Sequence, residues 1–189
     1  MAFRSHLLCL LFVALAAANP AFLVDNSQDE NTDYFDKRCA LNGFQYNSYN
    51  VKTFDNYVLK LFRIPGETGK PTNKKVVFMQ HGILDSADAW IVNHPEVAPA
   101  FELVRKGYDV WLGNSRGNKY SRTNTVLNPD KDKAEFFDFS FAEMGAGDLT
   151  AVIDFILKQT GASKLSYVGH SQGTTQFFYE LSKANDQLS

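Results

Sequence analysis

One short stretch of the sequence has the residue types and spacing that serine nucleophilic catalysis requires. It follows the pattern Gly-x-Ser-x-Gly and consists of Gly169, His170, Ser171, Gln172 and Gly173. It lies between an apolar segment at 164–168, typical of a buried strand, and a segment with helical spacing at 174–183. In a turn this sharp, side chains on both sides of the nucleophile would collide, which explains a glycine on each side.

We therefore predict that Ser171 is a catalytic nucleophile, exposed in a strained conformation at the start of a helix that stabilises negative charge. Gly169, His170 and Gly173 would shape the turn around it. The alternative is an ordinary serine that caps a helix.

A serine nucleophile also needs hydrogen-bond donors for the tetrahedral oxyanion. The amide of Gln172 is one candidate, because it directly follows the nucleophile. The loop after an earlier strand, Gln80 to Leu84, offers a second donor. We expect that donor to be the amide of Ile83, with His81 and Gly82 shaping the loop, because the glycine lets the backbone approach the substrate closely.

Strand and helix patterns alternate around these segments. Strand-like patterns cover 57–64, 75–79, 108–112 and 164–168; helical spacing covers 96–106, 140–161 and 174–183. Ser140 and Glu143 form a capping box at the start of the second helix. The alternation predicts an α/β fold: a mostly parallel sheet with helices on both faces and a ligand site at the carboxyl ends of the strands.

The N-terminal segment is typical of a secretory signal. Arg4 precedes an apolar run, Leu7 to Ala18, that ends in small residues, so we expect 1–18 to be cleaved. The acidic stretch 19–40 is predicted to be a polar leader, and 41–189 a single domain. Cys39 would then be the one thiol of the mature chain, which hints at missing sequence. The expected location is the secretory pathway, with extracellular space and lysosome left open.

Composition excludes other partners. The net charge is −2 and the basic residues are scattered, so nucleic acid is not an expected partner. No grouping of His, Cys or carboxylates has metal-ligand spacing, and neither a metal nor another cofactor is predicted. No stretch after the signal reaches the roughly 20 apolar residues of a membrane span.

The chain resembles the secreted acid lipases, the family of gastric and lysosomal acid lipases. The matching stretches are Gln80 to Leu84 with Ser86 and Trp90, the segment GYDVWLGNSRGN at 107–118, FSFAEM at 139–144 and YVGHSQGT at 167–174. The resemblance implies an α/β-hydrolase fold and hydrolysis of triacylglycerol or cholesteryl esters through an acyl-enzyme. It also implies that Ser171 is the nucleophile and that the amides of Ile83 and Gln172 form the oxyanion hole.

The sequence departs from this family in its catalytic triad. In this fold the general base and its orienting carboxylate follow the nucleophile, yet no histidine follows Ser171. We expect His81, His94 and His170 to be structural, and Arg116 to make a local salt bridge rather than bind substrate.

The family's C-terminal strands, lid and cap insertion would lie beyond Ser189. The strand at 164–168 would then be an open edge that favours aggregation.

Three functions are compatible with these residues. The first is a lipase of lipid breakdown, present as an incomplete catalytic domain. The second is a non-catalytic secreted protein that binds lipid or a partner lipase. The third is a carboxylesterase that acts on small soluble esters.

Overall fold

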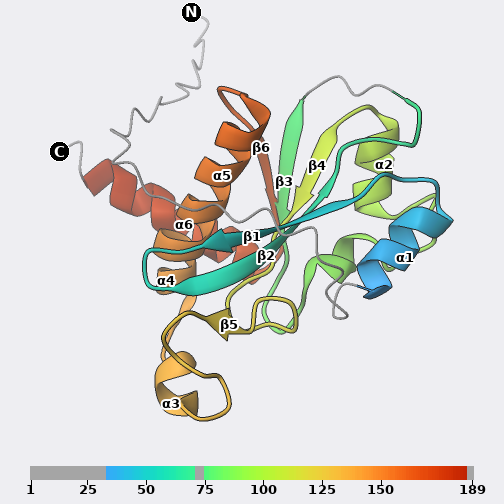
Figure 1. Ribbon diagram of the computed structural model, residues 1–189. Helices are drawn as coiled ribbons and strands as arrows, with labels where there is room; N and C mark the ends of the chain where they lie inside the picture. Colours follow the sequence, from blue (N-terminus) through green and yellow to red (C-terminus); the bar gives the residue numbers. More distant parts are fainter. Residues whose placement is uncertain (1–32, 71–74, 187–189) are drawn as a thin grey trace, which may run out of the picture.

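The computed structural model describes residues 33–70 and 75–186, which form a sheet with helices on both faces (Figure 1). The helices are α1 (Asp33–Leu41), α2 (Pro99–Arg105), α3 (Lys133–Phe136), α4 (Phe141–Glu143), α5 (Thr150–Thr160) and α6 (Gln172–Asp186). The strands are β1 (Asn47–Lys52), β2 (Tyr57–Ile64), β3 (Val76–Gln80), β4 (Asp109–Leu112), β5 (Thr123–Asn124) and β6 (Ser166–Gly169). The predicted signal, 1–18, and the leader up to residue 32 lie outside the described residues.

The strands form one mixed sheet in the order β1-β2-β4-β3-β6, with β5 paired to β2. The α/β class is therefore confirmed, and β3 runs parallel to both β4 and β6 as predicted. The expectation of a mostly parallel sheet was wrong around β2, which is antiparallel to β1, β4 and β5. For the β1–β2 pair the physical reason is the short turn between the two strands. Asn56 adopts a left-handed conformation there (φ 76), so the chain reverses direction without a crossover helix.

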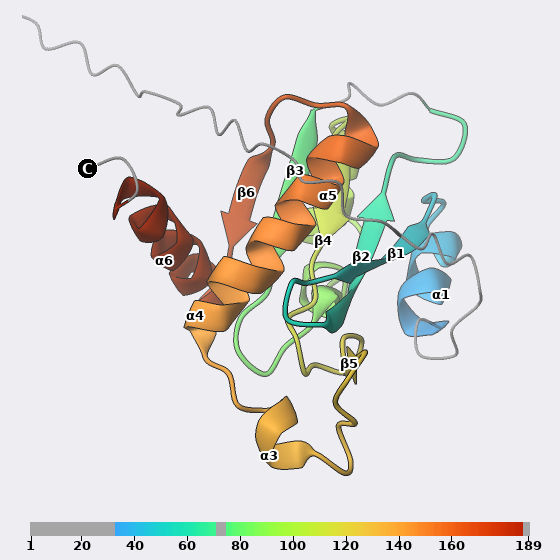
Figure 2. The ribbon, with the colours of Figure 1, turned by 60° about the vertical axis from the view of Figure 1, so that its left-hand side comes forward.

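Helices cover both faces of the sheet (Figure 2), and the buried apolar residues form two clusters. Helices α1 and α2 pack on one face, where Phe101 of α2 meets β-strand residues such as Phe62 and Met79. Helix α5 covers the other face through Phe155 and Ile156. Because all five residues of β3 are buried, this strand forms a rigid centre whose carboxyl end leads directly into the loop after Gln80.

The predicted polar leader was partly wrong, because residues 33–41 form α1 and belong to the domain. Phe35 and Cys39 stand one helical turn apart and are 0% exposed. Phe35 stacks on Phe62 of β2, with 4.3 Å between the ring centroids. Burial of the Phe35 side chain favours docking of this helix by about 1.5–3 kcal/mol.

The other predicted helices form with adjusted limits. The helix expected at 96–106 begins at Pro99, because proline fits the first helical turn but disfavours helical geometry in the residue before it. The capping box of Ser140 and Glu143 is confirmed, and the segment ends at Gly161 (φ 68). Between these limits a π-helical turn, Met144–Leu149, which was not predicted, joins α4 to α5.

Strand β6 is the last strand on the path of the described sheet, and its side chains alternate between half-buried and exposed. Within residues 33–70 and 75–186, no helix has the length and apolar character that a membrane span requires. The same residues contain no group of three or more His, Cys, Asp or Glu side chains suited to hold a metal ion.

Candidate functional site

Ser171 lies at a sharp corner between β6 and α6. Strand β6 ends at Gly169 and α6 begins at Gln172, so His170 and Ser171 alone make the turn. Ser171 has φ 51, in the left-handed region that a residue with a side chain seldom occupies. Such strain, of order 1–3 kcal/mol, persists only where surrounding structure holds it, and it is typical of functional sites. The side chain is exposed, as predicted for a nucleophile.

The two glycines of the motif are required by close backbone contacts. A Cβ at Gly169 would lie 2.8 Å from the amide nitrogen of Thr174, inside the same turn. A Cβ at Gly173 would lie 2.6 Å from the carbonyl oxygen of Gln80 and 2.8 Å from that of His81. The collision expected from the sequence is therefore real, but at Gly173 it involves β3 and the following loop rather than the motif itself.

The loop after β3 lies directly against Ser171. A Cβ placed on Gly82 would be 3.1 Å from the Cβ of Ser171 and 3.2 Å from Nδ1 of His170. The amide of His170 also donates a hydrogen bond to the carbonyl of Gln80 (3.0 Å). The structure thus brings together two segments that are about ninety residues apart in the chain.

Beyond Gly82 the loop turns outward. Ile83 and Leu84 are 62% and 100% exposed, and Leu84 has φ 60, a second strained position that sequence reasoning missed. No glycine or asparagine at this position signals the left-handed conformation.

The other predicted donor, Gln172, starts the 15-residue helix α6 directly after Ser171. Its amide belongs to the first turn, where free N–H groups and the helix dipole favour an anion.

The polar end of the segment 107–118 forms a buried framework beneath this loop. Asn114 accepts a hydrogen bond from the amide of Ala87 (3.0 Å) and donates one to the carbonyl of Lys60 (3.0 Å). The hydroxyl of Ser115 accepts one from the side-chain amide of Gln80 (2.9 Å). These bonds tie the loop at 80–87 to β2 and β4.

Arg116 has the structural role predicted for it, although its partners are distant in sequence. Its guanidinium is 1% exposed and forms ion pairs with Asp148 (2.7 Å) and with Asp55. Its backbone amide also donates to Asp148 (3.0 Å). The ring of Tyr57 lies under the guanidinium, 4.2 Å from it to the ring centroid. Asp148 belongs to the π-helical turn, so Arg116 joins this turn to the β1–β2 turn.

The three described histidines differ sharply in their surroundings. His81 is 2% exposed and both of its ring nitrogens are in hydrogen-bond contact with backbone groups. His94 lies on the surface, 3.9 Å from Glu96. His170 is exposed beside Ser171. Within residues 33–70 and 75–186, no histidine hydrogen-bonds to the hydroxyl of Ser171, so these residues contain a candidate nucleophile and candidate oxyanion donors without a histidine paired to that hydroxyl.

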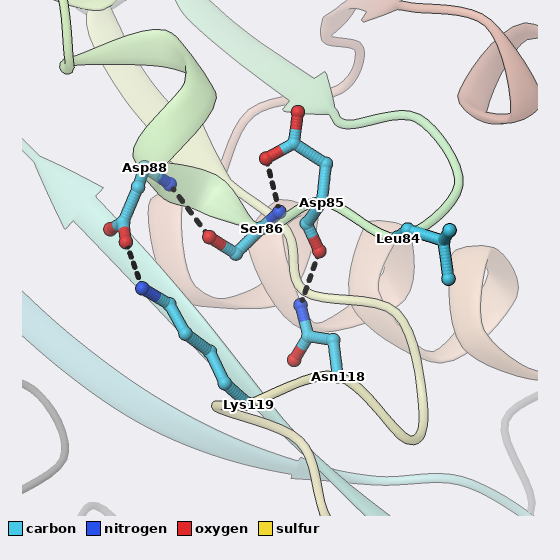
Figure 3. A pocket seen from close by; sticks show the side chains of 6 residues that line it. All are labelled: Leu84, Asp85, Ser86, Asp88, Asn118 and Lys119. Carbon is cyan, nitrogen blue, oxygen red and sulfur yellow. Dashed lines mark hydrogen bonds and ion pairs between the residues drawn. The ribbon is translucent and has the colours of Figure 1, made fainter.

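A cavity of about 470 Å³ lies beside the loop that follows β3 (Figure 3). Leu84, Asp85, Ser86, Asp88, Asn118 and Lys119 line it. Lys119 pairs with Asp88, and Asn118 donates to the carbonyl of Asp85 (3.3 Å). Three of its six lining residues, Asp85, Asp88 and Lys119, carry charged side chains.

Comparison with known proteins places this geometry in a family. Residues 35–94 match a family described as a partial alpha/beta-hydrolase lipase region, and residues 75–189 match the alpha/beta hydrolase fold. The chain belongs to the alpha/beta-hydrolase family. The first match begins inside α1, in agreement with the finding that this helix is part of the domain and not a leader.

The predicted resemblance of this chain to the acid lipases is confirmed by sequence comparison. It is 50% identical over 143 residues to human gastric triacylglycerol lipase, covering 74% of this chain and 35% of that protein. It is 48% identical over 150 residues to human lipase member K, covering 78% and 37%, and 44% identical over 153 residues to lipase 1 of Drosophila melanogaster, covering 81% and 33%. The chain therefore spans about a third of the length of these curated relatives.

Solved structures confirm the fold. An esterase from Pyrococcus furiosus superposes with a TM-score of 0.52 at 19% identity, covering 89% of this chain and 54% of that one. A cold-adapted esterase from an Arctic intertidal metagenomic library superposes with a TM-score of 0.51 at 18% identity, covering 73% and 55%.

Proposed function

We propose that this chain is part of a lipase that hydrolyses lipid esters through an acyl-enzyme on Ser171. The observation that carries the proposal is the strained conformation of Ser171 (φ 51) at a strand-to-helix corner, with Gly82 packed against it. The gastric lipase relatives, named for triacylglycerol, support this class of substrate. The secretory pathway is the proposed location, supported by the signal-like residues 1–18.

In the proposed reaction, Oγ of Ser171 attacks the ester carbonyl carbon and its proton passes to a base. The amides of Ile83 and Gln172 would donate hydrogen bonds to the resulting oxyanion. Collapse of this intermediate breaks the bond to the alcohol, which leaves with the proton, and water then hydrolyses the acyl-serine. A histidine base and its carboxylate are needed in addition to the described residues.

Because no general base contacts Ser171 among the described residues, the nucleophile can be tested by supplying a base from solution. Without its base, a serine hydrolase loses on the order of 10⁴- to 10⁶-fold in rate, but oxyanion stabilisation remains. We expect a fluorophosphonate to label Ser171 slowly, and added imidazole to accelerate the labelling by acting as the missing base. Peptide mass spectrometry would identify the labelled residue.

Two variants control this experiment. Ser171→Ala should abolish labelling, and Ser163→Ala, which removes an exposed serine outside the site, should not change it. Equal labelling of the Ser171→Ala variant would refute the nucleophile. No acceleration by imidazole would refute the explanation of slow labelling by the lack of a base.

The substrate class is tested separately. After imidazole rescue, hydrolysis of a triacylglycerol emulsion favours the lipase, whereas activity confined to short soluble esters favours a carboxylesterase. Binding to lipid particles without any labelling of Ser171 favours the non-catalytic alternative.

A further inference from the structure

His81 is held between two backbone groups at the start of the candidate oxyanion loop. Its Nδ1 lies 2.6 Å from the carbonyl oxygen of Gly82, and its Nε2 lies 3.1 Å from the amide nitrogen of Ser115. The side-chain amide of Asn118 is also within 3.2 Å of Nε2. Because the ring is 2% exposed, water does not compete for these contacts.

These contacts select one protonation state. A backbone amide can only donate, so Nε2 must accept from Ser115 and carries no proton. In the neutral ring the proton is then on Nδ1, which donates to the carbonyl of Gly82. A proton on Nε2 would face the N–H of Ser115 and repel it.

The ring of His81 contacts the candidate site through the carbonyl of Gly82. Gly82 is the residue that packs against Ser171, and the next amide in the chain is that of Ile83. The carbonyl of Gly82 and the amide of Ile83 belong to one planar peptide unit, so fixing the carbonyl fixes the direction of the amide. Holding this peptide unit therefore orients a candidate oxyanion donor.

We propose that His81 is a positioning residue: its neutral ring, fixed between Ser115 and Gly82, orients the Ile83 amide toward Ser171 and releases it when the ring is protonated. This inference rests on the proposed function, because it concerns the oxyanion hole of the same site. It assigns to His81 a role in oxyanion geometry rather than in proton transfer to substrate.

The groups around His81 determine the pH at which its ring gains a proton. Burial lowers the pKa of His81, while the carbonyl of Gly82, Asp85 and Asp88 act in the opposite direction. The cations nearby are engaged elsewhere, since Lys119 pairs with Asp88 and Arg116 pairs with Asp148 and Asp55. His170, across Gly82, is the other titratable group at this corner.

The lowered pKa gives a definite sign. Above the ordinary histidine pKa the ring is neutral in both folded and unfolded chains. Between that value and the lower folded pKa only the unfolded chain gains a proton, so stability falls with falling pH. The loop itself keeps its shape until the pH passes below the folded pKa of His81.

Nuclear magnetic resonance of the whole chain tests the proposal without requiring activity. Nitrogen-15 spectra should show a protonated Nδ1 and an unprotonated Nε2 at neutral pH. As the ring is protonated by acid, hydrogen-exchange protection of the Ser115 amide should fall about tenfold in the same step. Detecting the proton on Nε2 at neutral pH, or finding Ser115 protection unchanged through the titration of His81, would overturn the proposal.

Variants separate a positioning role from a merely structural one. His81→Asn places an amide donor near the Gly82 carbonyl, and His81→Gln places an acceptor near Ser115, but neither side chain titrates. In the unmodified chain, labelling of Ser171 by fluorophosphonate should fall as His81 is protonated, together with the protection of the Ser115 amide. We expect both variants to lose this acid-dependent fall in labelling and in protection. His94→Asn, which removes an exposed histidine, should retain it.

The two proposals fail in different ways. If Ser171 is never labelled but the ring and amide results hold, the hydrolase function is refuted and the hold of His81 on the loop stands. If labelling occurs and keeps its acid-dependent fall in both His81 variants, the role of His81 is refuted and the nucleophile stands. If one variant fails to fold, the tautomer of His81 and the exchange of the Ser115 amide in the unmodified chain still decide whether His81 holds the loop as proposed.

Discussion

Replacing Gly173 with alanine should damage the candidate site out of proportion to its effect on stability. The new Cβ would lie 2.6 Å and 2.8 Å from the carbonyl oxygens of Gln80 and His81, well inside normal contact. Gln80 is the last residue of β3 and is paired with β6, and His81 is the buried residue that follows it, so neither carbonyl can easily move aside. Helix α6 must therefore shift away from the loop, and Ser171 shifts with it.

The expected magnitude follows from two opposing effects. Overpacking costs about 1–3 kcal/mol, and alanine recovers about 0.5–1 kcal/mol because it favours a helix over glycine. We therefore expect Gly173→Ala to lower the free energy of unfolding by about 0.5–2 kcal/mol in urea titrations followed by circular dichroism. Labelling of Ser171 should slow on the order of ten- to a hundredfold, because small misplacements in a site have such effects.

Gly161→Ala is the matched control. This glycine ends α5 in a left-handed conformation (φ 68), and a Cβ added to it would have no atom within 4 Å, so alanine there costs about 1–2 kcal/mol through backbone strain alone. The two variants should lose similar stability, yet Gly161→Ala should label at the unmodified rate. Equal labelling of both variants would refute the claim that Gly173 is required by contact with β3.

Two further substitutions test the supporting framework. Arg116→Leu should lower the free energy of unfolding by about 3–5 kcal/mol, because it leaves Asp148 buried without its partner, and the exposed Arg122→Leu should cause no measurable change in the same urea titration. A loss at Arg116 no larger than at Arg122 would contradict the burial argument. Ser140→Ala should cost about 1 kcal/mol by removing the cap of α4, measured by thermal unfolding, while Thr150→Ala, inside the continuous helical segment, serves as the comparison. An unchanged melting temperature for Ser140→Ala would show that the cap contributes nothing.

The parts of the fold that sequence predicted well are those with a local cause. The strand at 57–64, the cap at Ser140 and the corner at Ser171 each follow from residue patterns within a few positions, and each is present. The contact between Gly82 and Ser171 is not local, and it was expected because a serine nucleophile needs oxyanion donors from an earlier strand loop. The roles of Ser171, Ile83 and Gln172 stay predictions that the labelling experiment addresses.

What sequence missed depends on contacts between distant segments. Helix α1 contributes only Phe35 and Cys39 to the core, too few for a helical pattern to stand out among its charges. The ion pairs of Arg116 join residues from three separate turns, so no spacing reveals them. The π-helical turn places Gly145 where a Cβ would be 2.8 Å from the carbonyl oxygen of Gln176 in α6, and Gly147 where a Cβ would be 2.6 Å from the guanidinium of Arg116. Both close contacts are with segments that are distant in sequence.

The burial of Cys39 makes the docking of α1 directly observable. Burial raises the pKa of this thiol and removes it from solvent, so a thiol reagent reacts with it only when α1 separates from the sheet. The labelling rate of Cys39 would therefore report how often this helix opens. Compared with the rate of global unfolding, it would show whether the N-terminal helix exchanges as an independent unit or moves only when the whole domain unfolds.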